Sequence, residues 1–351
     1  MQPRSFGKLP GGERLKRIQA SPNYHDSAFR NEVFTPMLSE DASYLKMIRE
    51  AMKKHPGRAP EMPLPVVFSK SPANKEQTIL TWFGHSTYLI QTAGLNLLVD
   101  PVFSSRASFS AYLGPKAYPM SADISLGDLP PIDIVILTHD HYDHLDYRTI
   151  QRLRGHVKTF YAPLGVGSHL SYWGIPDERI TELDWWEEVE LPGSIRLAAT
   201  PARHFSGRGF IRNQTLWASY VLQAGDIRLF LGGDSGYGDH FADIGSKHGP
   251  FDLVILENGQ YNPQWPFIHM LPEETVQAAI DLKGEALLPV HWGKFALAFH
   301  AWDDPVIRLL RKAKEMQVNV ATPRIGEAVI VGGDYPSSAW WSLNEGSAEK
   351  R

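Results

Sequence analysis

A continuous apolar run at residues 132–138, followed at once by a histidine-rich segment, is the feature that most constrains the fold. Residues 139–146 read His-Asp-His-Tyr-Asp-His-Leu-Asp. An apolar run of this length is typical of a strand buried on both faces, with the polar residues in the loop at its tip. Alternate residues of an extended segment share a face, so His139 and His141 can point the same way, while Asp143 and His144 fall on the next turn. Imidazole and carboxylate groups without sulfur suit Zn²⁺, Fe or Mn²⁺.

Three further polar residues follow predicted strands in the same manner. His204 comes after the run 195–200, Asp234 follows two glycines after the run 227–232, and His291 ends the run 287–290. Taken singly, each has an ordinary structural explanation, such as a satisfied buried histidine or a turn aspartate. Together with the histidine-rich loop they supply enough ligands for two adjacent cations.

Short apolar runs alternate with turns and amphipathic stretches from residue 78 onward, which predicts a mixed α/β layered fold. The expected strands are 78–83, 87–92, 95–100, 132–138, 158–162, 195–200, 216–222, 227–232, 253–256 and 287–290. The expected helices are 145–153, one opening at Pro272-Glu273-Glu274, and 303–314. The chemistry-bearing residues sit just after strands, where loops stand on a rigid scaffold.

Residues 1–75 differ in composition from the rest of the chain. They hold 13 Lys and Arg against 7 Asp and Glu, a charge of +6. Because the whole chain has a net charge of −4, the remaining residues carry −10. Prolines at 56, 60, 63, 65 and 72 predict an extended strap over a domain, with a short helix near 42–54. We expect this extension at 1–75, a hydrolase domain at 76–335 and a tail at 336–351. The basic excess is either a solvated arm or a peripheral contact with an anionic membrane surface.

Composition excludes several classes of protein. Apolar residues make up 43% of the chain, which can therefore bury a sizeable core. The absence of cysteine excludes a disulfide scaffold, a thiolate zinc site and a cysteine nucleophile. The net charge of −4 argues against a nucleic-acid partner. No run of eighteen apolar residues occurs, and the polar start lacks a signal-peptide pattern, so a cytoplasmic location is expected. The oligomeric state is left open.

The motif His139-x-His141-x-Asp143-His144, with His204, Asp234 and His291 downstream, resembles the metallo-β-lactamase superfamily. Within it the chain is more similar to the branch of N-acyl-phosphatidylethanolamine-hydrolysing phospholipases D. The similarity covers about residues 24–335. The stretches that carry it are 84–87, 100–108, 129–133, 182–188, 249–253 and 291–298. The resemblance implies a four-layer αββα sandwich with two metals at the strand tips.

The resemblance also implies roles for individual residues. One zinc would be held by His139, His141 and His204, and the other by Asp143, His144 and His291, with Asp234 bridging them. His269 matches an active-site histidine of the family that is not a primary ligand. Asp100 ends a strand near the same rim and is expected to orient a ligand imidazole by accepting its second N–H. His85 has either a similar orienting role or that of a packed core histidine.

These expectations lead to a hypothesis for function: a dinuclear zinc hydrolase, with Fe or Mn as alternative metals. A metal-bridging hydroxide would attack the phosphodiester bond of a phospholipid such as N-acyl-phosphatidylethanolamine, with Asp143 or Asp234 orienting it and His269 assisting the leaving oxygen. The alternative is a hydrolase of the same fold acting on a lactone, a thioester or a soluble phosphodiester. A nuclease or a non-catalytic scaffold fits less well, because the charge is negative and all seven ligand positions are filled.

Overall fold

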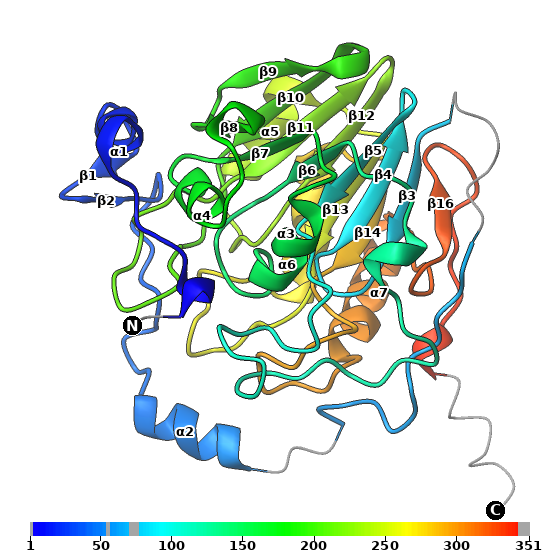
Figure 1. Ribbon diagram of the computed structural model, residues 1–351. Helices are drawn as coiled ribbons and strands as arrows, with labels where there is room; N and C mark the ends of the chain where they lie inside the picture. Colours follow the sequence, from blue (N-terminus) through cyan, green and yellow to red (C-terminus); the bar gives the residue numbers. More distant parts are fainter. Residues whose placement is uncertain (1–2, 54–56, 70–76, 343–351) are drawn as a thin grey trace, which may run out of the picture.

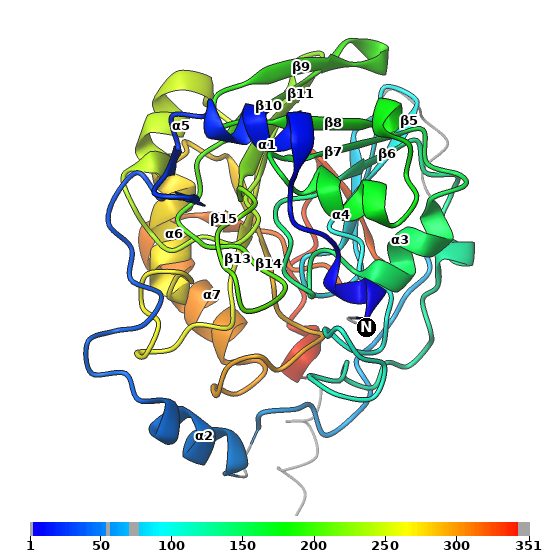
Figure 2. The ribbon, with the colours of Figure 1, turned by 60° about the vertical axis from the view of Figure 1, so that its left-hand side comes forward.

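The structure of the protein is a computed structural model that describes residues 3–53, 57–69 and 77–342. Two seven-stranded sheets lie face to face, and helices cover their outer faces (Figures 1 and 2). The expected αββα sandwich is therefore confirmed.

The first sheet has the order β16-β3-β4-β5-β6-β7-β8. Its strands are β3 (Ile79–Trp82), β4 (Tyr88–Thr92), β5 (Leu95–Val99), β6 (Ile134–Ile136), β7 (Thr159–Pro163), β8 (Ile180–Leu183) and β16 (Ala328–Ile330). Neighbours are antiparallel from β16 to β5 and parallel from β5 to β8. Val99 pairs with Ile136, so the residues that follow β5 and β6 leave the sheet side by side.

The second sheet has the order β15-β14-β13-β12-β11-β10-β9. Its strands are β9 (Glu188–Leu191), β10 (Ile195–Thr200), β11 (Ser219–Ala224), β12 (Ile227–Leu231), β13 (Leu253–Glu257), β14 (Ala286–Val290) and β15 (Asn319–Val320). Neighbours are antiparallel from β9 to β12 and parallel from β12 to β15. Glu257 pairs with Val290, which places the loops after β13 and β14 next to each other.

Burial on both faces of the sheets explains why the central strands are continuous apolar runs in the sequence. In β6, Ile134 and Ile136 point into the core between the sheets, while Val135 faces the helices outside. In β13, Ile255 points inward and Val254 outward. Both faces are buried, so both sets of side chains are apolar.

Helices form the two outer layers. The first sheet is covered by α3 (Tyr147–Leu153) and α4 (Gly167–Tyr172), and the second by α5 (His240–His248), α6 (Pro272–Asp281) and α7 (Asp304–Met316). As predicted, α6 begins at Pro272, and Glu274 in its first turn accepts a hydrogen bond from the Leu271 amide at 2.8 Å. No described helix has both the length and the apolar character needed to span a bilayer.

The N-terminal segment is less extended than expected. It contains α1 (Gly12–Gln19), the short hairpin of β1 (Tyr24–His25) and β2 (Ala28–Phe29), and α2 (Tyr44–Met52). The expected helix near 42–54 is α2, which lies apart from the layered body in both ribbon views (Figures 1 and 2). Phe29 is fully buried, so part of this segment belongs to the main core.

Most predicted elements match observed ones within a few residues, and the missed elements are short or lie at edges. The sequence did not predict α1, α4, α5, β1, β2, β8, β9, β15 or β16. Single helical turns occur at Arg4–Phe6, Leu126–Asp128, Asp177–Arg179, Pro192–Ser194 and Trp340–Ser342. The last of these buries Trp340 and Trp341 against Trp292 in the core between the sheets. The division at residues 75 and 335 stays a prediction.

Candidate metal centre

The residues predicted to bind metal lie together at one edge of the sandwich, in loops that leave both sheets. The loop after β6 approaches the single residues that follow β10, β12 and β14. Two groups have potential ligand atoms within 4.8 Å of one another: His139, His141, His204 and Asp234, and His85, Asp143, His144 and His291. The structure therefore brings all seven predicted ligands together.

In the first group, hydrogen bonds orient the imidazole rings of His139 and His204 so that one nitrogen of each ring faces the other potential ligands. The Thr138 hydroxyl donates to Asp100 Oδ2 at 2.6 Å, so it accepts from His139 Nδ1 at 3.0 Å. The Ile268 carbonyl can only accept, so His204 Nδ1 donates to it at 2.8 Å. Each ring is thereby left with an Nε2 lone pair.

The inward-facing nitrogens have the spacing that a single ion requires. His141 Nδ1 lies 2.9 Å from His139 Nε2 and 3.2 Å from His204 Nε2. Asp234 Oδ2 is 3.8 and 3.7 Å from the same two Nε2 atoms. Ligands at 2.0–2.1 Å from a tetrahedral zinc are about 3.4 Å apart, so these four atoms fit one such ion.

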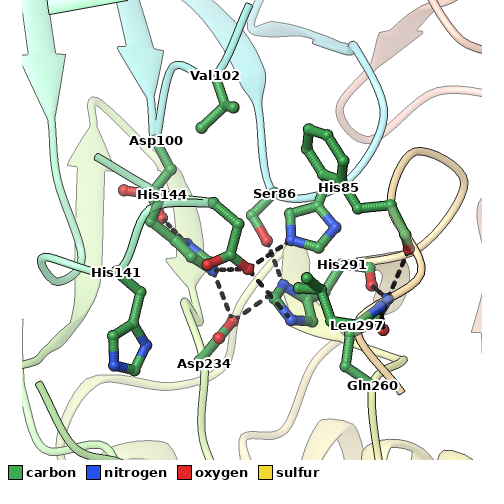
Figure 3. A network of polar contacts seen from close by, with 12 residues as sticks. His85, Ser86, Asp100, Val102, His141, His144, Asp234, Gln260, His291 and Leu297 are labelled. Carbon is green, nitrogen blue, oxygen red and sulfur yellow. Dashed lines mark hydrogen bonds and ion pairs between the residues drawn. The ribbon is translucent and has the colours of Figure 1, made fainter. Parts of the chain in front are cut away.

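Asp234 also faces the second group with its other oxygen. Asp234 Oδ1 lies 3.2 Å from His144 Nε2 and 3.1 Å from His291 Nδ1. Figure 3 shows His144 and His291 converging on this carboxylate from two sides. Asp143 Oδ2 is 3.5 Å from His144 Nε2. The carboxylate of Asp234 therefore faces both groups, with one oxygen toward each.

The glycine before Asp234 permits this placement. Gly233 has a φ of +61°, and a Cβ there would lie 2.8 Å from Thr138 Cβ. Any larger residue would push the loop after β12 away from the loop after β6.

Asp100 and His85 both contact predicted ligands. Asp100 Oδ2 accepts a hydrogen bond from His144 Nδ1 at 2.7 Å, the expected orienting contact. His85 Nε2 lies 2.8 Å from Asp143 Oδ2, so this buried histidine orients a carboxylate rather than only filling the core. Ser86 Oγ is 2.8 Å from His291 Nδ1.

Three of these residues have a left-handed backbone. The φ angles are +52° at His85, +40° at Asp100 and +66° at His291. Such conformations are uncommon for residues with a Cβ and concentrate at functional sites. The surrounding sheets therefore hold these side chains in strained positions.

Burial and charge set the protonation of the centre. Burial lowers the pKa of His139 and His204 well below the ordinary value, so both rings are neutral. Burial alone would also lower the pKa of His144, but Asp234 and the other neighbouring carboxylates raise it well above the ordinary value. The clustered carboxylates thus favour positive charge at this position, which a bound cation would supply.

His269 lies beside the cluster and is held by a residue that the sequence did not suggest. His269 Nδ1 is 2.7 Å from Oε2 of the fully buried Glu257. Burial would lower the pKa of His269, but the Glu257 carboxylate raises it to about 9. Asp234, Glu257, His269 and His291 also form a third group of potential ligand atoms. The available signal was a charged residue directly after the apolar run 253–256.

Asn31, in the N-terminal segment, clamps the loop that carries His204. Its Nδ2 donates to the His204 carbonyl at 2.8 Å, and its Oδ1 accepts from the His204 amide at 3.1 Å. Trp217 Nε1 donates to the same Oδ1 at 3.1 Å. The N-terminal segment therefore positions a predicted ligand.

Arg208 makes a second link between the N-terminal segment and the centre. This buried guanidinium donates to the carbonyls of Asp140 and Leu145 at 2.6 and 2.8 Å, and to the Ser5 carbonyl at 2.8 Å. It also lies 4.1 Å from the centre of the Tyr142 ring. One side chain thus ties both ends of the histidine-rich loop to the N-terminus.

The residues present fit two metal ions. Within the described chain, the buried atoms His144 Nε2, His291 Nε2 and Asp234 Oδ1 have no hydrogen-bond partner. Each buried polar atom left without a partner costs about 1–3 kcal/mol of folding free energy. Coordination of a cation would remove this cost for the atoms that face it. Neutral imidazole and carboxylate groups are ligands for zinc, iron and manganese.

Comparison with known proteins agrees with this geometry. A family model described as "Beta-lactamase superfamily domain" matches residues 95–292. An uncharacterized protein of Mycobacterium tuberculosis is 43% identical over 93% of this chain and 88% of its own length. The N-acyl-phosphatidylethanolamine-hydrolyzing phospholipase D 1 of Caenorhabditis elegans is 35% identical over 62% of this chain and 64% of its own length. The fold is also that of Igni18, a metallo hydrolase from Ignicoccus hospitalis, with a TM-score of 0.54 and 20% identity over 72% of this chain and 98% of that one.

Proposed function

The chain belongs to the beta-lactamase superfamily, and on that premise we propose that it is a dinuclear metal-dependent hydrolase that cleaves a phosphodiester bond of a phospholipid. One observation carries the proposal: two groups of buried ligand atoms share the carboxylate of Asp234. Zinc is the metal we propose, since the ligand atoms fit tetrahedral spacing.

Two divalent ions bound in these groups would lower the pKa of a water molecule and neutralise charge on the phosphate oxygens. The protein's part is to place and supply the remaining groups. Asp143 and Asp234 orient the attacking water as its oxygen approaches phosphorus, and the bond from phosphorus to the head-group oxygen breaks. His269, charged at neutral pH, gives its proton to the departing alcohol oxygen. Glu257 keeps the ring of His269 in position and charged.

Two observations support a lipid substrate: the similarity to a phospholipase D and an exposed apolar surface on α2. The name of the Caenorhabditis elegans relative indicates hydrolysis of N-acyl-phosphatidylethanolamine. The surface lies on α2, where Leu45, Ile48 and Met52 follow helical spacing and are 72%, 54% and 72% exposed. Lys46, Arg49 and Lys53 stand on or next to the same helix. This composition suits shallow insertion into an anionic bilayer, and we propose that α2 brings the enzyme to its substrate.

The test compares three substrates: N-acyl-phosphatidylethanolamine in vesicles, bis-p-nitrophenyl phosphate and an acyl homoserine lactone. With the lipid, we expect phosphatidic acid and an N-acylethanolamine as products. In ¹⁸O-labelled water the label is expected on the phosphate, because water attacks phosphorus. Hydrolysis of the lactone alone would overturn the phosphodiesterase proposal. Absence of the phosphate label would overturn the mechanism.

A further inference from the structure

The outer face of the first sheet carries a cavity that the metal centre does not use. The cavity has a volume of about 390 Å³ and lies between Phe83, which directly follows β3, and the loops at 103–105 and 116–124. Its apolar walls are Phe83, Phe103, Tyr118, Met120 and Ile124. None of the predicted metal ligands lines it. Pockets of 300–1,000 Å³ with mainly apolar walls and a few polar groups are typical of small-molecule sites.

Lys294 lines this apolar cavity with a buried charge. The residue is 6% exposed, and its Nζ donates to the Val102 carbonyl at 2.7 Å. The same Nζ lies 5.5 Å from the centre of the Phe103 ring, which lines the cavity with it. An ammonium group has three donors, and this one donates to the Val102 carbonyl while the Asp146 carboxylate acts on its charge. A buried ammonium group that no carboxylate contacts directly is costly unless a ligand supplies that contact.

The pKa of Lys294 agrees with this environment. Burial lowers it to about 8, which still leaves most of the side chain charged at neutral pH. The other charged residues at the cavity, Lys116 and Asp123, have opposite signs. Lys294 therefore gives the cavity a single net positive charge.

The cavity continues along the sheet as a second one of about 470 Å³. Phe83 and Ile124 line both. The second cavity adds the apolar residues Val67, Leu89, Leu129 and Pro130, with no basic residue among those that line it. Phe68, 59% exposed, stands at its rim. The two cavities together form a mainly apolar groove, with Lys116 and the buried Lys294 toward one end and the acidic residues Asp123 and Asp128 among its lining.

We propose that this groove binds the single chain of a fatty carboxylate, with the carboxylate on Lys294 and the hydrocarbon along Phe83 and Ile124 toward Leu89. The one buried ammonium among the residues that line the groove, that of Lys294, matches a mono-anionic head group, and the shared walls match one unbranched chain. This site is separate from the proposed metal centre, so its ligand need not be the substrate.

Isothermal titration calorimetry of the full-length protein with decanoate tests the proposal. We expect one decanoate per chain, weaker binding of decyl phosphate beside Asp123, and weak binding of both decanol and propionate, which lack the charge or the chain. Lys294→Met keeps the length of the side chain and removes the charge. We expect it to weaken decanoate binding by at least about tenfold and decanol binding little.

Lys312→Met, on the surface of α7, is the matched control for charge and should bind decanoate as wild type does. Ala117→Trp fills the cavity with Lys294 intact and should weaken decanoate and decanol alike, which tests the site even if Lys294→Met fails to fold. Equal affinity for decanoate and decanol in the wild type would overturn the assignment. So would unchanged decanoate binding in Ala117→Trp, or tighter binding of decyl phosphate than of decanoate.

Discussion

Asp100 accepts a hydrogen bond from His144 Nδ1 at 2.7 Å, and this bond turns His144 Nε2 toward Asp234, 3.2 Å away. The same carboxylate accepts from the Thr138 amide at 2.8 Å and from its hydroxyl at 2.6 Å. Through Thr138 it also sets the tautomer of His139. One buried aspartate therefore orients a histidine of each predicted metal group.

Asp100→Asn is expected to weaken metal binding by about 10- to 100-fold, because the amide cannot accept all three hydrogen bonds. Competition with a chelator measures the affinity. Asp133→Asn is the control, since Asp133 lies before β6 at the other end of the same strands and bonds to the Asn96 amide. Equal losses in the two variants would contradict the orienting role.

The contact between His269 and Glu257 predicts a pH dependence. kcat/KM should fall as pH rises through about 9, because His269 then loses the proton that it gives to the leaving oxygen. Glu257→Gln removes the charge that raises this pKa, so the fall should move to lower pH. Glu273→Gln on α6, which breaks a half-buried pair with Arg308 away from the predicted metal ligands, should leave the profile in place. A fall at the same pH in all three proteins would show that His269 is not the acid.

Arg208→Met is expected to destabilise the fold by about 2–5 kcal/mol, because it leaves the carbonyls of Ser5, Asp140 and Leu145 without their charged donor. Arg208→Lys should recover little, since one ammonium cannot reproduce the planar set of donors. Chemical denaturation measures the difference. Arg212→Met, at a more exposed position, serves as the control. Stability equal to the wild type in Arg208→Met would contradict the proposed link.

The triple variant with serine at Leu45, Ile48 and Met52 should bind anionic vesicles at least about tenfold less tightly, because it removes the apolar face of α2. Its kcat/KM on soluble bis-p-nitrophenyl phosphate should not change. Serine at Ile280 and Ile307, which are 37% and 41% exposed on α6 and α7, is the control. Vesicle sedimentation measures the binding. If both sets of variants bind as the wild type does, α2 is not the membrane contact.

Much of the fold could be predicted because its strands are buried on two faces. The run 132–138 is apolar for that reason, and so are 253–256 and 287–290. β9 was missed because it is an edge strand whose exposed positions carry Glu188 and Glu190. The prediction of an extended N-terminal strap was only partly correct. The sequence of α1 has few apolar residues and carries basic residues on its exposed side, so it lacks the apolar periodicity that predicts a helix.

The site was predictable where the ligands stand beside strand ends. Asp100 followed from its place after a strand. Asn31 could not be found in this way, because its partner His204 lies 173 residues away and both contacts are to backbone atoms. Glu257 directly follows the apolar run 253–256, and only the structure shows that its buried carboxylate contacts His269.

The central claim is that two ions share Asp234, and metal content measured together with phosphodiesterase activity tests it most directly. The wild type, loaded with zinc and freed of excess, should hold two ions per chain. Asp234→Asn and His141→Ala should each hold fewer and show no turnover of the lipid substrate. A wild-type protein that holds no more than one ion, or an Asp234→Asn variant that keeps two ions and full activity, would contradict the account.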